Sequence, residues 1–378
     1  VSSNPTGIYL WLSSNNTITN NNASGNGYSI FLVSSTNNNI TYNNASSSNY
    51  SIYLSSSNNN RITNNTMFFG GGIYLFSSCN TNLTGNIMYG CGIIIDGSFI
   101  SDWNTHEIDT SNKVNGKPVY YYRNQNGGTV PSPAGQVILA NCTGMTVENL
   151  DVSTASRGIQ LGFSSYNTVK NNNASGNARE GIFLVSSHCN TITNNNASGN
   201  SYGIYLWYSS NNTITNNNAS GNSWDGISLY ASSNNNLTYN WICNNAHCGV
   251  SITSGSTGNI IHHNNFIGNG ATALRYLSQG VSNDTPNGAK GVNGNSQAYD
   301  SVGGNYWYDN TAHEGNYWSN WDGQGWGSPD AYPIDGGAGA SDWYPLNGPV
   351  VPECSKFLLV ALLTLYLFGL VAVRKRQK

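Results

Sequence analysis

The sequence of 378 residues is poor in charge, since only 8% of its residues are Asp, Glu, Lys or Arg. An ordinary soluble domain carries about a quarter. The 14 basic residues are outnumbered by 17 acidic ones, so the chain lacks the basic surplus of a nucleic-acid binder. The residues that build helical bundles and coiled coils are also scarce. Aromatic residues make up 12%, which argues against a disordered charged tail.

What the sequence has in abundance is asparagine, serine and glycine, and these residues recur in a repeat. Segment 7–26 returns almost unchanged as segment 203–222. An aliphatic residue recurs about every 22 residues, and a second apolar column follows about ten residues later. The first column contains Ile8, Ile30, Ile52, Ile73, Ile93, Val137, Ile159, Ile182, Ile204, Ile227 and Val250. Two columns with one period indicate a repeat architecture.

The length of the repeat selects the fold. Short runs of alternating apolar and polar residues predict strands, and the Asn, Ser and Gly clusters between them predict turns. A unit of about 22 residues suits one coil of three short strands, stacked in parallel on the next coil at about 4.8 Å. We therefore predict an all-β parallel β-helix solenoid of about 11 coils with a C-terminal cap.

One asparagine of each repeat lies three residues after the second apolar column. Stacked amides in register can hydrogen-bond along the column, and asparagine tolerates the left-handed backbone of tight corners. We expect a structural ladder, which explains the asparagine excess without a ligand. Its members are Asn21, Asn43, Asn65, Asn86, Asn172, Asn195, Asn217 and Asn240.

The repeat is interrupted once and ends in a different composition. We predict coils over 1–95 and 136–282, separated by an insertion over 96–135 with a hairpin turn at Asn115-Gly116. Residues 283–350 are expected to cap the open core, and 351–378 to form a membrane anchor. The apolar stretch runs uncharged from Phe357 to Val373 and is followed by a basic end, which predicts a transmembrane helix with 1–352 outside the cell.

With these residues in view, the chain resembles the archaeal NosD-like right-handed parallel β-helix proteins, also called periplasmic copper-binding repeat proteins. The resemblance covers 7–347 and rests on the repeat 211–222, on segments 114–121 and 134–143, and on the cap motifs 315–318 and 332–335. It implies a right-handed helix and a role in copper-site assembly as an alternative function. Separately, Pro352, Glu353 and Cys354 resemble a PEF-type archaeal sorting motif, with Cys354 in place of the usual Phe.

An aromatic column is the main candidate binding surface. In Ile-Tyr-Leu the two aliphatic residues face the core, so the middle residue faces outward. Rings that repeat at about 4.8 Å could stack on the sugar units of a glycan, or they could be covered by the insertion or by a neighbouring molecule. The column contains Tyr9, Phe31, Tyr53, Tyr74, Phe183 and Tyr205.

Residues for metal binding and catalysis are few. The chain has three Met and six His, with His262-His263 as the only adjacent histidine pair. We expect no cofactor, and capping or turn roles are favoured for the carboxylates of the cap, with Ca²⁺ binding as the alternative. These carboxylates are Asp322, Asp330, Asp335 and Asp342.

Between 152 and 271 the coils contain only two acidic residues, Glu180 and Asp225. The one group of carboxylates near the coils that resembles an enzyme site is Asp96, Asp102, Glu107 and Asp109. We therefore predict a surface-anchored protein that is not an enzyme and acts as an envelope, adhesive or carbohydrate-binding scaffold. Its expected partners are polysaccharide or other envelope proteins, and the membrane through 357–373, with no nucleic acid. A carbohydrate-active enzyme is a further alternative. Sequons such as those at Asn22 and Asn44 predict glycosylation.

Overall fold

The computed structural model describes residues 3–46, 49–270, 296–319, 331–346 and 349–350. In this part of the chain the fold is an all-β, right-handed-type solenoid of about 12 turns with one short helix, α1 (Ser101–Asn104). The predicted membrane helix at 357–373 and the sorting residues Pro352, Glu353 and Cys354 lie outside the described residues. Among the described residues, no helix has the length and apolar character that a membrane span requires.

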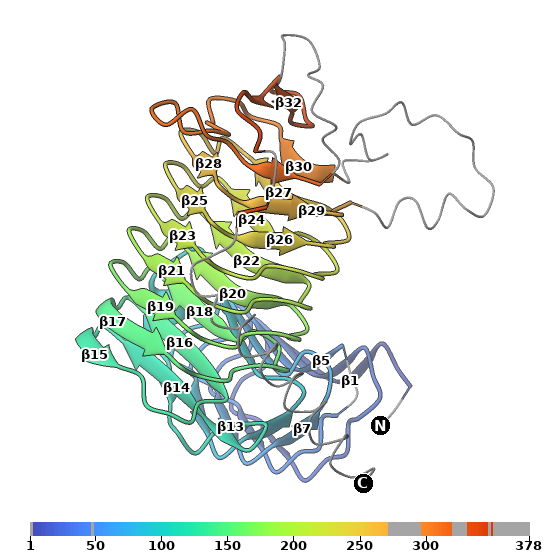
Figure 1. The fold of residues 1–378 in the computed structure, drawn as a ribbon. Helices are drawn as coiled ribbons and strands as arrows, with labels where there is room; N and C mark the ends of the chain where they lie inside the picture. The colour runs from blue at the N-terminus through green and yellow to red at the C-terminus, as the bar shows by residue number, and fades with distance from the viewer. Residues whose placement is uncertain (1–2, 47–48, 271–295, 320–330, 347–348, 351–378) are drawn as a thin grey trace, which may run out of the picture.

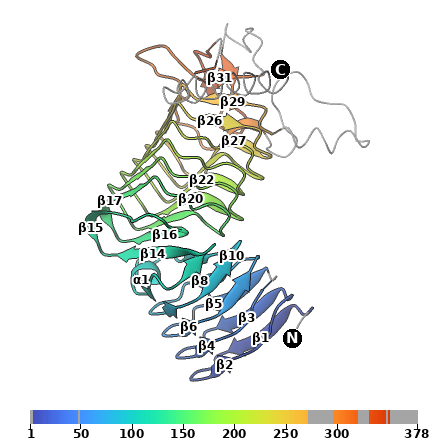
Figure 2. The ribbon, with the colours of Figure 1, turned by 60° about the horizontal axis from the view of Figure 1, so that its bottom comes forward.

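The turns form two stacks that meet at an angle (Figure 2). The N-terminal stack, residues 3–114, has three faces. Its first face is a five-stranded parallel sheet of β1 (Thr6–Trp11), β3 (Tyr28–Val33), β5 (Tyr50–Ser55), β8 (Ile73–Phe76) and β11 (Ile93–Asp96). The second face contains β2 (Thr17–Thr19), β4 (Asn39–Thr41), β6 (Arg61–Thr63), β9 (Asn82–Thr84) and β12 (Glu107–Ile108). The third contains β7 (Thr66–Phe68), β10 (Ile87–Tyr89) and β13 (Lys113–Val114).

The C-terminal stack, which contains the described residues of 117–270, 296–319 and 331–346, repeats this plan (Figure 1). Its first face contains β14 (Lys117–Arg123), β16 (Gln136–Ala140), β18 (Ile159–Gly162), β20 (Glu180–Val185), β22 (Tyr202–Trp207), β24 (Ile227–Tyr230), β27 (Cys248–Thr253) and β30 (Ser296–Asp300). The second contains β15 (Asn126–Thr129), β17 (Thr143–Glu148), β19 (Thr168–Lys170), β21 (Thr191–Thr193), β23 (Thr213–Thr215), β25 (Asn236–Thr238) and β28 (Ile260–His262). Short strands complete the third face and the cap: β26 (Trp241–Cys243), β29 (Asn265–Ile267), β31 (Tyr317–Trp318), β32 (Tyr332–Pro333) and β33 (Ser341–Asp342).

Parallel pairing in register stacks each aliphatic residue on its equivalent in the next coil. Ile8 pairs with Ile30, and Ile30 with Ile52, so the columns of the sequence become columns of the core. Burial of these apolar side chains is the main favourable contribution to folding. At the C-terminal end the rings of Phe266, Trp318 and Tyr332 stack at 4.2 and 4.1 Å between centroids and close the core.

The asparagine column lies inside the coils as a hydrogen-bonded ladder. Each side-chain Nδ2 donates to the Oδ1 of the next coil, for example from Asn172 to Asn195 at 2.9 Å and from Asn195 to Asn217 at 3.0 Å. The left-handed backbone at these corners belongs to the preceding residue, such as Asn171 or Asn194, and not to the ladder residue itself. From the sequence we expected one asparagine of each coil both to form the ladder and to adopt the left-handed backbone.

The two stacks are joined by a hairpin, and here the expectation of one continuous helix with an insertion is wrong. Strands β12 and β13 still belong to the N-terminal stack, pairing with β9 and β10. Asn115 and Gly116 both have positive φ, 51° and 78°, which is the geometry of a two-residue hairpin turn. Strand β14 therefore runs antiparallel to β13 and starts the second stack. Ile93 and Val137 are two repeat lengths apart, so the spacing of the aliphatic column gives no sign that the chain reverses between them.

Strand β11 ends its sheet, and glutamine side chains of the second stack cover its edge. Gln136 accepts a hydrogen bond from the Ile93 amide at 2.9 Å and donates to the Ile93 carbonyl at 2.7 Å. Gln160 also donates to the Ile93 carbonyl at 2.7 Å and accepts from the Ile95 amide at 3.2 Å. An exposed strand edge would invite pairing with another chain, so these contacts both protect the edge and fix the angle between the stacks.

A buried histidine next to α1 makes stability depend on pH. His106 accepts a hydrogen bond from the Thr81 amide at 3.2 Å, and its Nε2 lies 2.9 Å from the Asp102 carbonyl. Burial is the main cause that lowers the pKa of His106 to about 4, with Arg123 adding to it. The unfolded chain takes up this proton near pH 6.5, so it binds more protons than the folded chain between pH 6.5 and 4.

We expect the free energy of unfolding to fall by about 2 kcal/mol from this residue between pH 7 and pH 5. Urea unfolding of the parent and of His106→Asn at both values measures it. The variant should lose less stability than the parent on acidification. Equal losses in the two proteins would show that His106 is not the cause.

Candidate functional site

Four of the predicted aromatic residues form one column on the outer face of the N-terminal stack. The ring centroids of Tyr9 and Phe31 are 5.4 Å apart, and those of Phe31 and Tyr53 are 5.0 Å apart. The distance from Tyr53 to Tyr74 is 4.8 Å. Exposure falls along the column from 54% at Tyr9 to 9% at Tyr74, because the column runs into the junction between the stacks.

A second aromatic column, which the sequence reasoning missed, lies beside the first. Tyr28 and Tyr50 stack with centroids 5.3 Å apart, and Tyr50 stacks on Tyr74 at 5.5 Å. Tyr28 also stacks on Phe31 at 4.8 Å, so the two columns form one continuous surface of rings. The signal was present in the sequence, since Tyr28, Tyr50 and Tyr202 occupy the same position of the repeat.

The remaining two predicted residues lie on the C-terminal stack, across the junction. Phe183 faces outward from β20, yet it is only 1% exposed, so it cannot stack on a ligand as predicted. The reason is that the Arg157 guanidinium lies 4.0 Å from its ring centroid and the N-terminal stack packs over it. Tyr205 remains half-buried, 5.7 Å from Phe183, and stacks on Tyr202 at 5.1 Å.

Charged side chains fill the bottom of the angle between the stacks. Arg157 is 2% exposed and pairs with Asp96 of the first stack at 2.6 Å and with Glu180 of the second at 2.5 Å. Burial opposes the charge on Arg157, but the two carboxylates outweigh it and raise the pKa of the guanidinium. Tyr74 donates a hydrogen bond to Asp96 at 2.6 Å. These contacts hold the two stacks together at a fixed place.

Arg179 is the member of this cluster that reaches solvent. Its guanidinium lies 5.6 Å from the Tyr74 ring centroid and 3.9 Å from Glu180, and its side chain is 36% exposed. It lines a cavity of about 690 Å³ that spans both stacks. The cavity is also lined by Asn49, Tyr50, Phe69, Gly70, Gly71 and Ser156.

We call this surface the elbow groove. It consists of Tyr28, Phe31, Tyr50, Tyr53, Tyr74, Arg179, Tyr202 and Tyr205. Burial is the largest cause that raises the pKa of Tyr53 and of Tyr205 to about 12, and it also raises the pKa of Tyr74 and Tyr202. These four tyrosines are therefore neutral phenols at physiological pH, and each can donate and accept a hydrogen bond.

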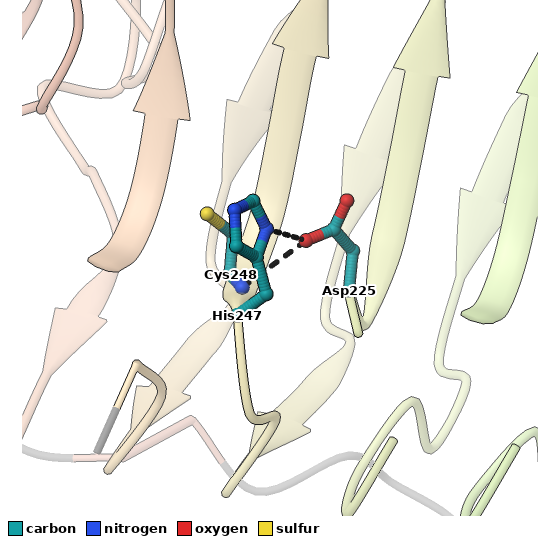
Figure 3. Close-up of side chains that lie close together, drawn as sticks. All are labelled: Asp225, His247 and Cys248. Carbon is teal, nitrogen blue, oxygen red and sulfur yellow. Dashed lines mark hydrogen bonds and ion pairs between the residues drawn. The ribbon is translucent and has the colours of Figure 1, made fainter. Parts of the chain in front are cut away.

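A second cavity of about 370 Å³ continues the groove along the C-terminal stack, between Tyr202, Tyr205 and Tyr299. Asp225 and His247 lie in its wall, and Cys248 lies next to them (Figure 3). The Asp225 Oδ1 is 2.6 Å from the His247 Nδ1 and accepts a hydrogen bond from the Cys248 amide at 3.1 Å. Burial raises the pKa of Asp225 despite these contacts.

The predicted calcium ligands are only partly described. Asp322 and Asp330 lie outside the described residues, whereas Asp335 and Asp342 lie in the cap. Asp342 is fully buried, and its oxygens accept hydrogen bonds from the Asn316 amide at 2.7 Å and the Trp318 indole at 2.9 Å. Burial raises its pKa to about 6. These contacts give Asp342 a structural role in the cap.

Comparisons with known proteins give a family and a set of similar folds. A family model described as "Periplasmic copper-binding protein (NosD)" matches residues 1–126 and 85–312. No curated protein matches. A solved structure of a variant of the periplasmic alginate epimerase AlgG matches with 15% identity and a TM-score of 0.32, covering 62% of this chain and 62% of that one. The A-module of mannuronan C-5 epimerase AlgE6 from Azotobacter vinelandii matches with 12% identity and a TM-score of 0.35, covering 71% and 86%.

The chain therefore spans less than two thirds of the AlgG chain. These solved β-helices are enzymes, which contradicts the prediction that the present chain is not an enzyme. That prediction rested on the low number of carboxylates along the sequence. The number and linear spacing of the carboxylates were misleading, because the fold brings Asp96 of the first stack and Glu180 of the second to the same arginine, Arg157.

The family description implies copper, and the described donor groups fit copper poorly. The three methionines, Met67, Met88 and Met145, are buried in the core. The imidazoles of the adjacent histidines already contact other groups, since the Nδ1 atoms of His262 and His263 are 2.5 Å apart and the His263 Nε2 lies 2.5 Å from Glu314. Cu(I) favours soft ligands, and copper–thiolate sites of the blue type use two imidazoles. Among the described residues, the one group with three suitable donors offers a single imidazole and includes a hard carboxylate.

Proposed function

The chain belongs to the NosD family of β-helix proteins, and on this premise we propose that it binds a polysaccharide outside the cytoplasm, in the elbow groove. The observation that carries the proposal is a pair of stacked aromatic surfaces on the two sides of the junction, Tyr28 to Tyr74 on the first stack and Tyr202 with Tyr205 on the second, with Arg179 lying over Tyr74. A β-helix presents such surfaces with fixed spacing, because the rings of each stack sit on neighbouring strands of one parallel sheet.

Aromatic rings provide large contact area at a low cost in conformational entropy. The face of a pyranose ring carries apolar C–H groups that pack on such rings, while its hydroxyls need hydrogen-bond partners. The phenol hydroxyls of Tyr50, Tyr53 and Tyr202 supply these partners along the groove. A chain of sugars laid along the columns would meet a ring at each coil, 4.8–5.5 Å apart.

One arginine of the groove, Arg179, favours an acidic polysaccharide. Asp96 and Glu180 carry two negative charges, and Arg157 and Arg179 carry two positive ones, so the cluster is neutral as a whole. Arg157 is buried and saturated, whereas Arg179 turns toward the cavity with a longer contact of 3.9 Å to Glu180. A guanidinium binds a carboxylate with two parallel hydrogen bonds, so we propose that Arg179 binds the carboxylate of a uronic acid unit.

Binding to immobilised neutral and uronic acid polymers tests this proposal. Replacing both Tyr50 and Tyr53 with alanine should weaken binding about tenfold or more, because two stacking contacts are lost. Arg179→Ala should weaken binding to the acidic polymer and leave binding to a neutral one unchanged. The matched control is Tyr42→Ala, because Tyr42 is 60% exposed and lies outside the groove.

The proposal fails if the parent protein binds none of the polymers, or if the groove variants and Tyr42→Ala bind equally. The same polymers should be analysed for cleaved or epimerised units, because the similar solved structures are alginate epimerases.

The finer part of the proposal is a place on the archaeal cell surface, held by the helix predicted at 357–373. Membrane fractionation of the full-length chain, with 357–373 deleted as the comparison, tests that part.

A further inference from the structure

Asp225, His247 and Cys248 form a cluster that the polysaccharide-binding role does not explain. A carboxylate oxygen, an imidazole nitrogen and the thiol sulfur all lie within 4.8 Å of one another. Asp225 is 2% exposed and Cys248 is fully buried, and the imidazole of His247 stacks on Trp224 with centroids 4.6 Å apart. In the view of Figure 3 the sulfur lies on the side of the imidazole away from Asp225.

The fold itself brings these residues together. Asp225 lies two residues before β24, and His247 lies directly before β27, which begins at Cys248. Strands β24 and β27 are paired in parallel on neighbouring coils, so residues about one repeat apart become neighbours. Asp225 and His247 are 22 residues apart, about one repeat, so the stacking of coils and not a short sequence motif brings them together.

The buried carboxylate of Asp225 pairs with His247 at 2.6 Å and accepts hydrogen bonds from the Cys248 amide at 3.1 Å and from Ser228. A buried carboxylate is costly unless charge and hydrogen bonds compensate it, and a bound cation would supply the charge. No other group of three His, Cys, Asp or Glu side chains in the described part of the chain comes this close together.

We propose that Asp225, His247 and Cys248 bind one Zn²⁺ ion. Zn²⁺ accepts thiolate sulfur, imidazole nitrogen and carboxylate oxygen in the same site, and it imposes no preferred geometry of its own. The hard carboxylate and the single imidazole disfavour copper, so the proposal departs from the description of the family.

Three protein ligands leave one position of a tetrahedral zinc site open. The open position would face the cavity of about 370 Å³ that Tyr202, Tyr205 and Tyr299 line. A polar group of a ligand in the groove, or a water molecule, can occupy it. The metal proposal does not depend on the polysaccharide proposal, because the three ligands come from the protein alone.

Metal binding to the purified full-length protein tests the proposal. After removal of metal with a chelator and addition of Zn²⁺, mass spectrometry should find one zinc per chain. Co²⁺ in place of Zn²⁺ should give a thiolate-to-cobalt charge-transfer band. Both signals should be lost in Cys248→Ala and in His247→Gln, and both should persist in Cys243→Ala, which removes a free, half-buried thiol of the same coil.

Circular dichroism of each variant shows whether it is folded, and His247→Gln is the safer substitution because His247 is partly exposed. The proposal is overturned if the folded parent binds no zinc, or if the cobalt band survives in Cys248→Ala.

Discussion

Replacing Arg157 with methionine should lower the free energy of unfolding by about 3–5 kcal/mol. Methionine keeps much of the side-chain volume but removes the charge that Asp96 and Glu180 share. Both carboxylates would then remain buried without a cation, which is the costly state for such groups. The contact with Phe183 would also be weakened. Urea unfolding, followed by tryptophan fluorescence, measures the change.

Two further variants separate this explanation from a loss of packing. Arg123→Met removes an arginine whose pair with Glu107 is exposed, so it should cost less than about 1 kcal/mol. Adding Asp96→Asn and Glu180→Gln to Arg157→Met removes all three charges and should restore most of the lost stability. If the triple variant is as unstable as Arg157→Met alone, the buried charges are not the reason.

The asparagine ladder should be the other large contribution. Asn195 is 2% exposed, and its Oδ1 accepts hydrogen bonds from the backbone amide and the side chain of Asn172. Its Nδ2 donates to the Val169 carbonyl and to Asn217. Asn195→Ala leaves several of these buried groups without partners, at about 1–3 kcal/mol for each, so we expect a total loss of at least about 3 kcal/mol.

Asn195→Asp tests the direction of the hydrogen bonds. The carboxylate can still accept from Asn172, but it cannot donate to Val169 or Asn217 unless it is protonated. We therefore expect Asn195→Asp to be at least as unstable as the alanine variant at pH 7 and to recover on acidification. Asn211→Gly is the control, because Asn211 is exposed with φ of 60° and glycine adopts this backbone freely. Equal losses at Asn211 and Asn195 would contradict the ladder explanation.

Much of the fold could be predicted because a solenoid repeats the same local physics in every coil. The period of the aliphatic column predicts the stacking, and the pairing of Ile8 with Ile30 follows from it. The hairpin at Asn115-Gly116 could also be located from its turn residues. Its consequence could not, because nothing local indicates that β14 starts a second stack at an angle to the first.

The candidate site was predictable only where it follows the repeat. Tyr9, Phe31, Tyr53 and Tyr74 lie one coil apart, so alternation along the strand sufficed to find them. The contacts at the junction between the stacks do not recur with the repeat. Arg157 pairs with Asp96, 61 residues earlier in the chain, and the same contact buries Phe183. Contacts of this kind depend on the angle between the stacks, which is a property of the whole fold.

The central claim is that the elbow groove holds a polysaccharide, and a crystal structure with a bound uronic acid oligosaccharide tests it most directly. We expect sugar rings packed along Tyr50 and Tyr53, with a carboxylate paired to Arg179 in the cavity between the stacks. An oligosaccharide bound on another face of the solenoid, with this cavity empty at saturating concentration, would contradict the claim.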